Sequence, residues 1–479
     1  MKKIYKYTFL IAVATATLLP GCGKDYFEEK RQNPNLVTQA TLSGLLATST
    51  AKAGLNSFTV ASLVAPYVQY TANPTVGAAS DIYESIDFTG TWDALYFAMA
   101  DVNEMKKLAV AQGSSEYLGV ANVLLAYNLI LANDLWGDAP FSAAFDVRNL
   151  TPKYDTQQVL YATSLSLINE AITELTKTDA TLKLAAASDM IYGAAAATER
   201  ARWLKTAYAI KARLLIKVSK TAQYNAADVL TAVTNSYVSN AEDAGMATFV
   251  LRNNWATVAI NNASLTLGGW LSEQLIDHLN GKTYGVFDPR IRKITDPTVT
   301  VATPWIGTVN GAGNRAPGNN TVKDENYISQ NSPWTSATAP LLLVTYAELK
   351  FIEAEAAFAT DKTRSYTAYL AGINANMDKL QVPAADAERV AYLAAASVGA
   401  ANLTLDLIFR EKYVATYLNA EAWNDARRYD YKYKDFGMPS NAVLPTFIRR
   451  LDYPQGERSK NGANVPVNPV RTAKLWWDQ

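Results

Sequence analysis

The chain has 479 residues, 49% hydrophobic and 18% charged, with 44 basic and 44 acidic side chains, values typical of a globular protein with a large core. This balance does not indicate a nucleic-acid binder, and the sequence has no polybasic cluster for lipid headgroups. The single Cys excludes an internal disulfide, and the single His, His278, excludes multi-histidine metal sites.

The N-terminal segment has the pattern of an export signal followed by a lipid anchor. Residues 1–21 combine three Lys near the start with an apolar run from Phe9 to Leu19, as in secretory signal peptides. The only Cys, Cys22, follows Leu-Pro-Gly, which resembles a bacterial lipobox. We therefore predict a signal peptide over 1–21, lipidation of Cys22 and a polar tether over 22–40. Acyl chains contribute about 0.8 kcal/mol per buried methylene, so two or more anchor a protein stably.

The next predicted helices lead to a long apolar segment. We expect one or two helices over Thr41 to Val68 and another that Thr91 caps. From Tyr117 to Leu135 nearly every residue is apolar, which is typical of a buried helix, and Gly137 can end it. The segment approaches the length of a membrane span, but three Asn and one Asp favour a core helix.

A second group of amphipathic helices follows. Tyr154 to Leu175 begins with Asp155 as the expected N-cap, and Gln158 stands at the capping-box position. Arg202 to Lys220 has an apolar face and a basic face that we expect to be solvated or ion-paired, formed by Lys205, Lys211, Arg213 and Lys217.

Helical periodicity weakens from about Tyr224 to Ala339, where Gly, Asn, Thr and Pro accumulate. His278 stands near the end of a short helix in this region, and we expect it to interact with the last carbonyls rather than to catalyse. Helices return at Thr345, which forms a predicted capping box with Glu348.

Several segments resemble the SusD/RagB family of outer-membrane nutrient-binding lipoproteins from Bacteroidetes. They are NDLWGDAPFSAAF from Asn133, PKYDTQQVLY from Pro152, DPRIRKI from Asp288, TYAELKFIEAEA from Thr345 and the helix pair from Leu405 to Tyr431. The tail segments FIRRLDYP and KLWWDQ also match the family's ending.

This resemblance implies a mainly α fold and a single SusD-like domain over 41–479. Four tetratricopeptide-like helix pairs would form a scaffold over about 41–222 and 341–431, with an irregular, loop-rich lobe over about 223–340 and a C-terminal tail over 432–479. It also implies a lipid-anchored protein of the outer membrane that faces the cell exterior. Such a protein captures nutrients for a SusC-like TonB-dependent transporter, without catalysis and without a cofactor.

Two aromatic-bearing loops, Tyr70 to Trp92 and Trp305 to Trp334, are the expected places for ligand contact. Loops on a rigid frame commonly carry function, and exposed aromatic rings pack on sugar rings or peptide side chains. No family motif can be carried over here, so loop context alone selects the candidates Tyr70, Tyr83, Trp305, Arg315, Tyr327 and Trp334. The alternative is that these aromatic side chains fix the lobe onto the scaffold.

The ligand class and the absence of catalysis are open at this stage. An oligosaccharide is the expected ligand, and a peptide is the alternative within the family. A glycan hydrolase needs two carboxylates about 5–10 Å apart. Glu353 and Glu355, two apart on a helix, point to different faces and suit contacts on the helix surface. A purely structural helical adaptor is a third hypothesis, but it leaves the aromatic loops without a purpose.

Overall fold

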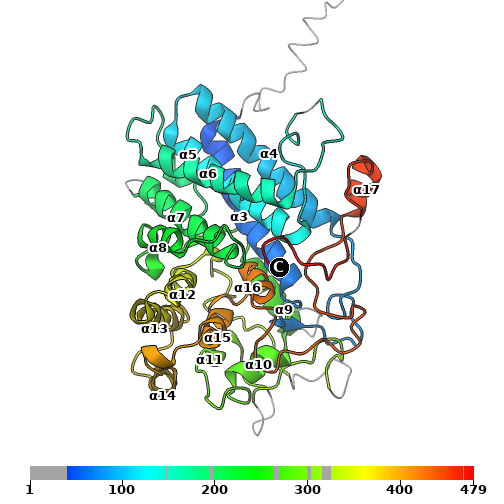
Figure 1. Cartoon of the computed structure of the whole chain (residues 1–479), viewed down its shortest axis with the longest axis vertical. Helices are drawn as coiled ribbons and strands as arrows, with labels where there is room; N and C mark the ends of the chain where they lie inside the picture. Colours follow the sequence, from blue (N-terminus) through cyan, green and yellow to red (C-terminus); the bar gives the residue numbers. More distant parts are fainter. Residues whose placement is uncertain are drawn as a thin grey trace, which may run out of the picture. The chain divides into compact units, whose positions relative to one another are not determined.

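Long helices pack on one another in chain order and form the larger part of the structure (Figure 1). The computed structural model describes residues 40–146, 148–193, 198–263, 269–298, 304–315, 325–467 and 469–479, and Leu42–Gln479 form one unit. The predicted signal peptide and Cys22 lie outside the described residues, as does all of the tether but its last residue. The first helices of the stack are α3 (Leu42–Val64), α4 (Thr89–Ala111), α5 (Ser115–Trp136), α6 (Gln157–Thr176), α7 (Glu199–Lys217) and α8 (Ala226–Thr234).

The stack continues after a long excursion of the chain. Helix α8 contacts both α7 and α12 (Tyr346–Ala357), and α12 packs on α13 (Lys362–Lys379) and α15 (Leu405–Ala415). The stack therefore extends past residue 223, the predicted start of the irregular lobe. Three further helices follow α12 along the chain: α14 (Ala387–Ala396), α16 (Glu421–Arg428) and α17 (Gln455–Asn461).

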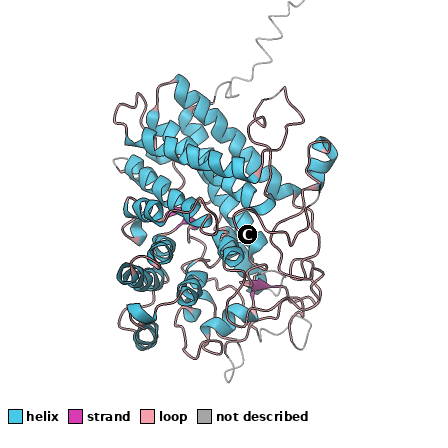
Figure 2. Ribbon diagram, viewed as in Figure 1, coloured by secondary structure: helices cyan, strands magenta, loops and turns pink. Residues whose placement is uncertain are grey.

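The excursion between α8 and α12 is mostly loop, with short helices and strands (Figure 2). Its elements are β2 (Ala244–Met246), α9 (Asn254–Ala263), β3 (Trp270–Leu271), α10 (Glu273–Leu279), α11 (Ile291–Ile294) and β4 (Leu341–Val344). Strand β3 pairs antiparallel with β1 (Thr71–Ala72), and β2 pairs antiparallel with β4. The predicted fold class, a mainly helical SusD-like fold with an irregular lobe, is confirmed.

Helix α5 is the buried centre of the stack, as its composition predicts. It is long and apolar enough to cross a membrane, yet 94% of its most apolar window is buried by the rest of the protein. Asn128 finds internal partners: its side chain accepts a hydrogen bond from Asn56 at 2.7 Å and donates one to the Leu124 carbonyl. Gly119 lets α6 approach closely, because a Cβ there would lie 2.4 Å from Leu175.

The helix starts differ in part from the predictions. Thr345 caps α12 as expected by accepting from the Glu348 amide. Helix α6, however, is capped by Thr156, because the Asp155 carboxylate is already bonded to the amides of Phe141 and Ser142. Helix α4 starts at Thr89, before the predicted cap, and no side chain caps it.

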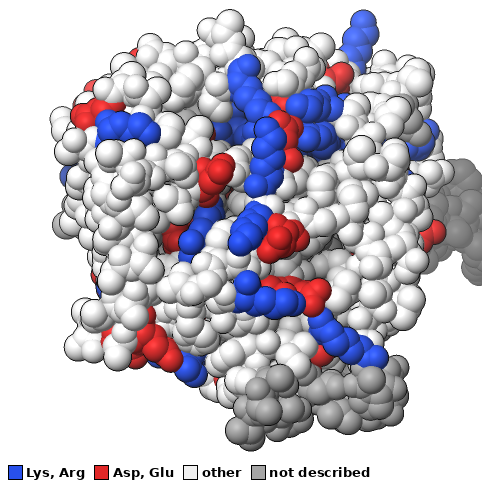
Figure 3. All heavy atoms as spheres, turned by 60° about the horizontal axis from the view of Figure 1, so that its bottom comes forward, with Lys and Arg blue, Asp and Glu red and all other residues white. Residues whose placement is uncertain are grey.

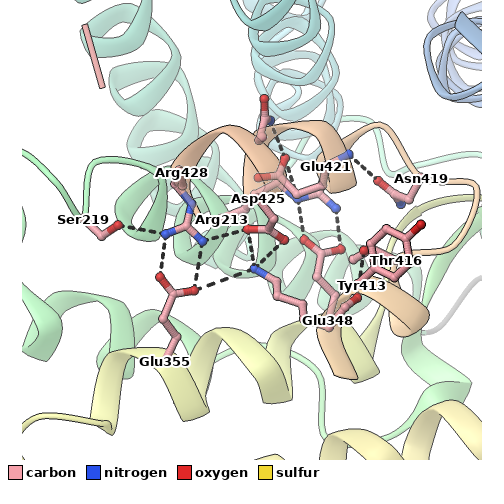
Figure 4. Close-up of polar contacts among 12 residues, drawn as sticks. Arg213, Ser219, Glu348, Glu355, Tyr413, Thr416, Asn419, Glu421, Asp425 and Arg428 are labelled. Carbon is pink, nitrogen blue, oxygen red and sulfur yellow. Dashed lines mark hydrogen bonds and ion pairs between the residues drawn. The ribbon is translucent and has the colours of Figure 1, made fainter. Parts of the chain in front are cut away.

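A buried network of ion pairs joins the later helices (Figure 4). Arg213 on α7 pairs with Glu348 on α12 at 2.7 Å, and Arg428 on α16 pairs with Asp425 at 2.7 Å. Arg428 also pairs with Glu355, whose side chain is only 8% exposed. The prediction that Glu353 and Glu355 make contacts on the helix surface is therefore wrong for Glu355, because it faces the charges of α16.

The predicted basic face of α7 is divided between surface and core. Arg213 and Lys217 are buried and ion-paired, Lys217 to Asp134 at 2.6 Å. Burial raises the pKa of Glu421, which faces this group, to about 7, although the charges of Lys217 and Arg213 act to lower it. Buried charges of this kind depend on their partners, since an unpaired ion in the core is very costly.

Candidate ligand-binding site

A hollow of about 270 Å³ lies where the lobe meets the C-terminal end of α3. We call it the loop hollow. Its wall comes from the end of α3 and the following turn, from β1 and the connection to α4, from α9, and from Gly269 before β3. Most of the lining is apolar with a few polar groups, which is the usual make-up of a small-molecule site. The residues that line it are Ser62, Leu63, Pro66, Tyr67, Thr71, Ala72, Asn73, Ser80, Asp81, Ile86, Phe88, Trp255, Val258 and Gly269.

Asp81 holds the two predicted aromatic loops together at this hollow. Its buried carboxylate accepts from the Asn73 amide at 2.9 Å and from the Gly311 amide at 3.2 Å. The Gly77 amide donates in turn to the Gly311 carbonyl at 3.0 Å. Gly311 has a φ of +79°, and a Cβ there would collide with the Ser440 carbonyl. The two loops are thus brought into contact, although 230 residues separate Asp81 from Gly311.

Burial raises the pKa of Asp81 from its ordinary 3.8 to about 6, against the lowering effect of its hydrogen bonds. A carboxyl with such a pKa, set in the wall of an apolar hollow, is a typical feature of a functional site. Because its side chain is fully buried, its role is to hold the two loops in place around the hollow.

Three aromatic side chains give the loop hollow its apolar surface. Trp255 starts α9 and meets Phe58 edge-on, with ring centroids 4.8 Å apart. Phe88 is half-buried at the entry to α4, and Tyr67 is buried. Trp255 and Phe88 were not predicted as site residues. The signal that could have found Trp255 is an aromatic residue after two Asn in a loop-rich region.

Tyr70 and Tyr83, both predicted to contact ligand, are core residues. Tyr70 is 1% exposed, and its hydroxyl donates to the Tyr413 carbonyl at 2.5 Å. Tyr83 is 0% exposed and lies edge-on to Tyr67 at 5.8 Å, so it supports the hollow from behind. Neither side chain has surface for a ligand, because both are buried.

Trp334 and Tyr327 also lie next to the hollow rather than in it. Trp334 is 6% exposed and lines a narrow gap with Phe58 and Trp255. It therefore fixes the lobe to α3, which is the alternative role considered for the aromatic residues. Tyr327 is half-buried beside Trp270, and the amide of the next residue, Ile328, donates to Gly269 at the edge of the hollow.

Trp305 and Arg315 lie on another part of the lobe. The half-buried Trp305 ring has the Arg292 guanidinium 5.6 Å from its centroid, and Arg292 in turn pairs with Glu388 at 2.7 Å. Arg315 pairs with Glu273 at 2.6 Å. On the end of the molecule turned forward in Figure 3, basic and acidic side chains lie side by side in this way. The six predicted residues are thus not gathered at one place.

His278 makes no contact with the last carbonyls of α10, contrary to the prediction. Its ring lies between Tyr284 and Tyr413, at centroid distances of 4.7 and 5.4 Å, and within the described chain neither ring nitrogen has a hydrogen-bond partner. Burial, and then the charges of Arg410 and Arg290, hold the pKa of His278 well below its usual value. The ring is therefore neutral and packs as an aromatic side chain.

A helical scaffold thus carries loops around a hollow of about 270 Å³ with a mainly apolar lining. Residues 32–454 match the family profile described as "Starch-binding associating with outer membrane", and the chain belongs to this SusD-like family. The resemblance predicted from short segments is thereby confirmed over most of the chain.

Solved structures share the fold. A SusD/RagB family protein from Bacteroides thetaiotaomicron superposes with a TM-score of 0.71 at 20% identity, over 92% of this chain and 99% of that chain. A chitin-binding SusD homologue from Flavobacterium johnsoniae gives 0.72 at 19% identity, over 91% and 98%. A further chitin-binding protein gives 0.74 at 23% identity, over 92% and 100%. At these identities the likeness establishes the fold alone. The comparison with curated proteins finds no match.

Proposed function

We propose that this chain is a surface lipoprotein that captures an oligosaccharide in the loop hollow and passes it to a SusC-like TonB-dependent transporter. Family membership supports the nutrient-binding role, and two proteins of the same fold bind chitin. The observation that carries the proposal is the loop hollow, in which Phe88 and Trp255 offer apolar faces beside the polar groups of Asn73 and Ser80. Sugar rings present an apolar face and a rim of hydroxyls, which suits this combination.

The make-up of the hollow argues for binding rather than hydrolysis. Among the described residues that line it, Asp81 is the only carboxylate. Glycoside hydrolases use two carboxyl groups on either side of the scissile bond. Asp81 is also engaged by two backbone amides of the loops, so its first role is to shape the site.

The test is a titration of the purified protein with chitin oligosaccharides, malto-oligosaccharides and peptides. Phe88→Ala removes a half-buried lining ring and should weaken glycan binding roughly tenfold, since one lost ring contact is worth about 1 kcal/mol or more. Phe97→Ala is the matched control, because Phe97 is 62% exposed on α4 outside the hollow. Equal glycan affinity of Phe88→Ala and Phe97→Ala would contradict the loop hollow as the binding site. Binding of peptides alone would favour a peptide as the ligand.

The anchor and the partner have separate tests in the native host. Cys22→Ala should release the protein from the outer membrane, because acyl chains supply the attachment. A tagged wild-type protein should co-purify with a TonB-dependent transporter. Retention of the Cys22→Ala protein on the cell surface would contradict the lipid anchor, and recovery of the wild type without any transporter would contradict the delivery role.

A further inference from the structure

A second hollow, of about 330 Å³, lies around α10, at the lower end of the view in Figure 1. Its wall comes from Gln69, from residues 272–274 with Asp277, from the turn at 282–283, from 309–310 and from the tail at 435–439. We call it the acceptor hollow. Its volume lies within the range of about 300–1,000 Å³ of small-molecule pockets and is roughly ten times the share of one water. It shares no lining residue with the loop hollow.

Two buried amide side chains line the acceptor hollow and bond the tail through their nitrogens. Gln69 and Gln274 are 6% and 7% exposed. The Gln69 side-chain nitrogen donates to the Gly437 carbonyl at 2.6 Å, and that of Gln274 donates to the Lys434 carbonyl at 3.1 Å. Because a carbonyl can only accept, each amide must direct its nitrogen to the tail. Both Oε1 atoms are then left without a donor in the described part of the chain.

Several donors of the wall are already used. The Ser272 hydroxyl donates to Asn310 at 2.6 Å, and the Asn310 amide donates to the Thr71 carbonyl at 2.9 Å. The Lys282 ammonium donates to Asp277 at 2.6 Å. These groups are therefore engaged with one another, whereas the Gln69 and Gln274 side-chain oxygens accept no hydrogen bond from the described residues.

One acidic group at the acceptor hollow is left without a cation among the described residues. Glu273, Asp277 and Asp435 are acidic, and Lys282 is the only basic residue of the described lining. Asp435 is exposed and has no ion pair or hydrogen bond with any described side chain. Two further cations lie just outside the wall: Arg315 pairs with Glu273, and the Lys434 ammonium donates to the Thr283 carbonyl.

We propose that the acceptor hollow binds an amino sugar through its protonated amine. An ammonium group offers three donors and no acceptor, which complements the free Gln69, Gln274 and Asp435 oxygens. A bare ion would leave most of the volume unfilled. A pyranose ring fills it and can rest its apolar face on Val309, Met438 and Pro439, which complete the wall. This second site is independent of glycan capture in the loop hollow.

The experiment titrates the whole protein with the glucosamine dimer, its N-acetylated form and a lysine-containing peptide. Asp435→Asn removes a free, exposed carboxylate and should weaken glucosamine-dimer binding about three- to tenfold, as expected for the loss of one charged contact. Asp228→Asn is the matched control, an exposed carboxylate on α8 outside both hollows. Phe88→Ala, which affects the loop hollow alone, should leave this binding unchanged.

Three results would overturn the proposal. One is unchanged binding of the glucosamine dimer by Asp435→Asn. The second is equal binding of the N-acetylated dimer at this site, because an acetylated amine carries no charge. The third is a lysine peptide that binds as tightly and depends on Asp435 in the same way, since the site would then recognise the ammonium without the sugar.

Discussion

The helical stack and the loop-rich lobe are stabilised by different means. In the stack, long apolar faces pack together and buried ion pairs join α7, α12, α15 and α16. In the lobe, single buried polar side chains hold backbone segments: Asp81 joins two loops, and Asn253 joins α9 to the segment before β4. The stack can therefore provide a rigid frame, while a few hydrogen bonds determine the shape of the loop hollow.

The largest effect is expected from breaking an ion pair in the stack. Arg213→Ala leaves the Glu348 carboxylate, which is 0% exposed, without its cation. Removing one partner of a buried pair costs about 3–5 kcal/mol, so urea unfolding should show a loss of that size. Lys211→Ala, a half-buried position of the same helix, should change stability by no more than about 0.5 kcal/mol. A loss below 1 kcal/mol for Arg213→Ala would show that the network does not stabilise the stack.

A smaller and more local effect is expected from Asn253→Ala in the lobe. The buried Asn253 side chain donates to the Ala339 carbonyl at 2.7 Å and accepts from the Trp255 amide at 2.7 Å. Its removal leaves unsatisfied backbone groups, at a cost of about 1–3 kcal/mol. Hydrogen exchange should speed up in α9 and near Ala339 while the amides of α5 stay protected. Uniform loss of protection across the chain would contradict the separation of the two regions.

Asp81 gives the lobe a pH dependence. Its pKa is raised to about 6 in the folded protein, above the ordinary 3.8, so the folded state binds the proton more tightly. Its contribution to stability is therefore fully present below pH 3.8 and is lost as pH rises to about 6. The unfolding free energy of the wild type minus that of Asp81→Asn should fall as pH rises through this window. Above the window this difference should be constant. A difference that rises with pH would mean that the Asp81 pKa is lowered instead.

The smallest effect is expected at the exposed pair of Arg292 with Glu388, whose side chains are 51% and 38% exposed. Exposed ion pairs contribute between about 0 and 1 kcal/mol. Glu388→Gln should therefore shift the urea midpoint only slightly, and this shift should shrink in high salt. A loss comparable to that of Arg213→Ala would remove the contrast between surface and core charges.

The sequence predicts the helices of the stack well because the signals that specify a helix lie within a few residues of one another. The apolar run of α5 and the Thr345 cap of α12 can be read within a few residues, and both are found. The site is harder to predict because its contacts are remote. Nothing near Tyr70 shows that its hydroxyl bonds a carbonyl 343 residues away, and nothing near Asp81 indicates Gly311. Loop context therefore selected Tyr70, Tyr83 and Trp334, which lie outside the loop hollow, and it passed over Phe88 and Trp255, which line it.

The most direct test of the account is a crystal structure of the protein with the oligosaccharide that binds most tightly in titration. The account predicts an intact ligand in the loop hollow, with a sugar ring against Phe88 or Trp255 and hydroxyls near Asn73 and Ser80. A ligand found only on the surface around Trp305, or recovered as cleaved products, would contradict it.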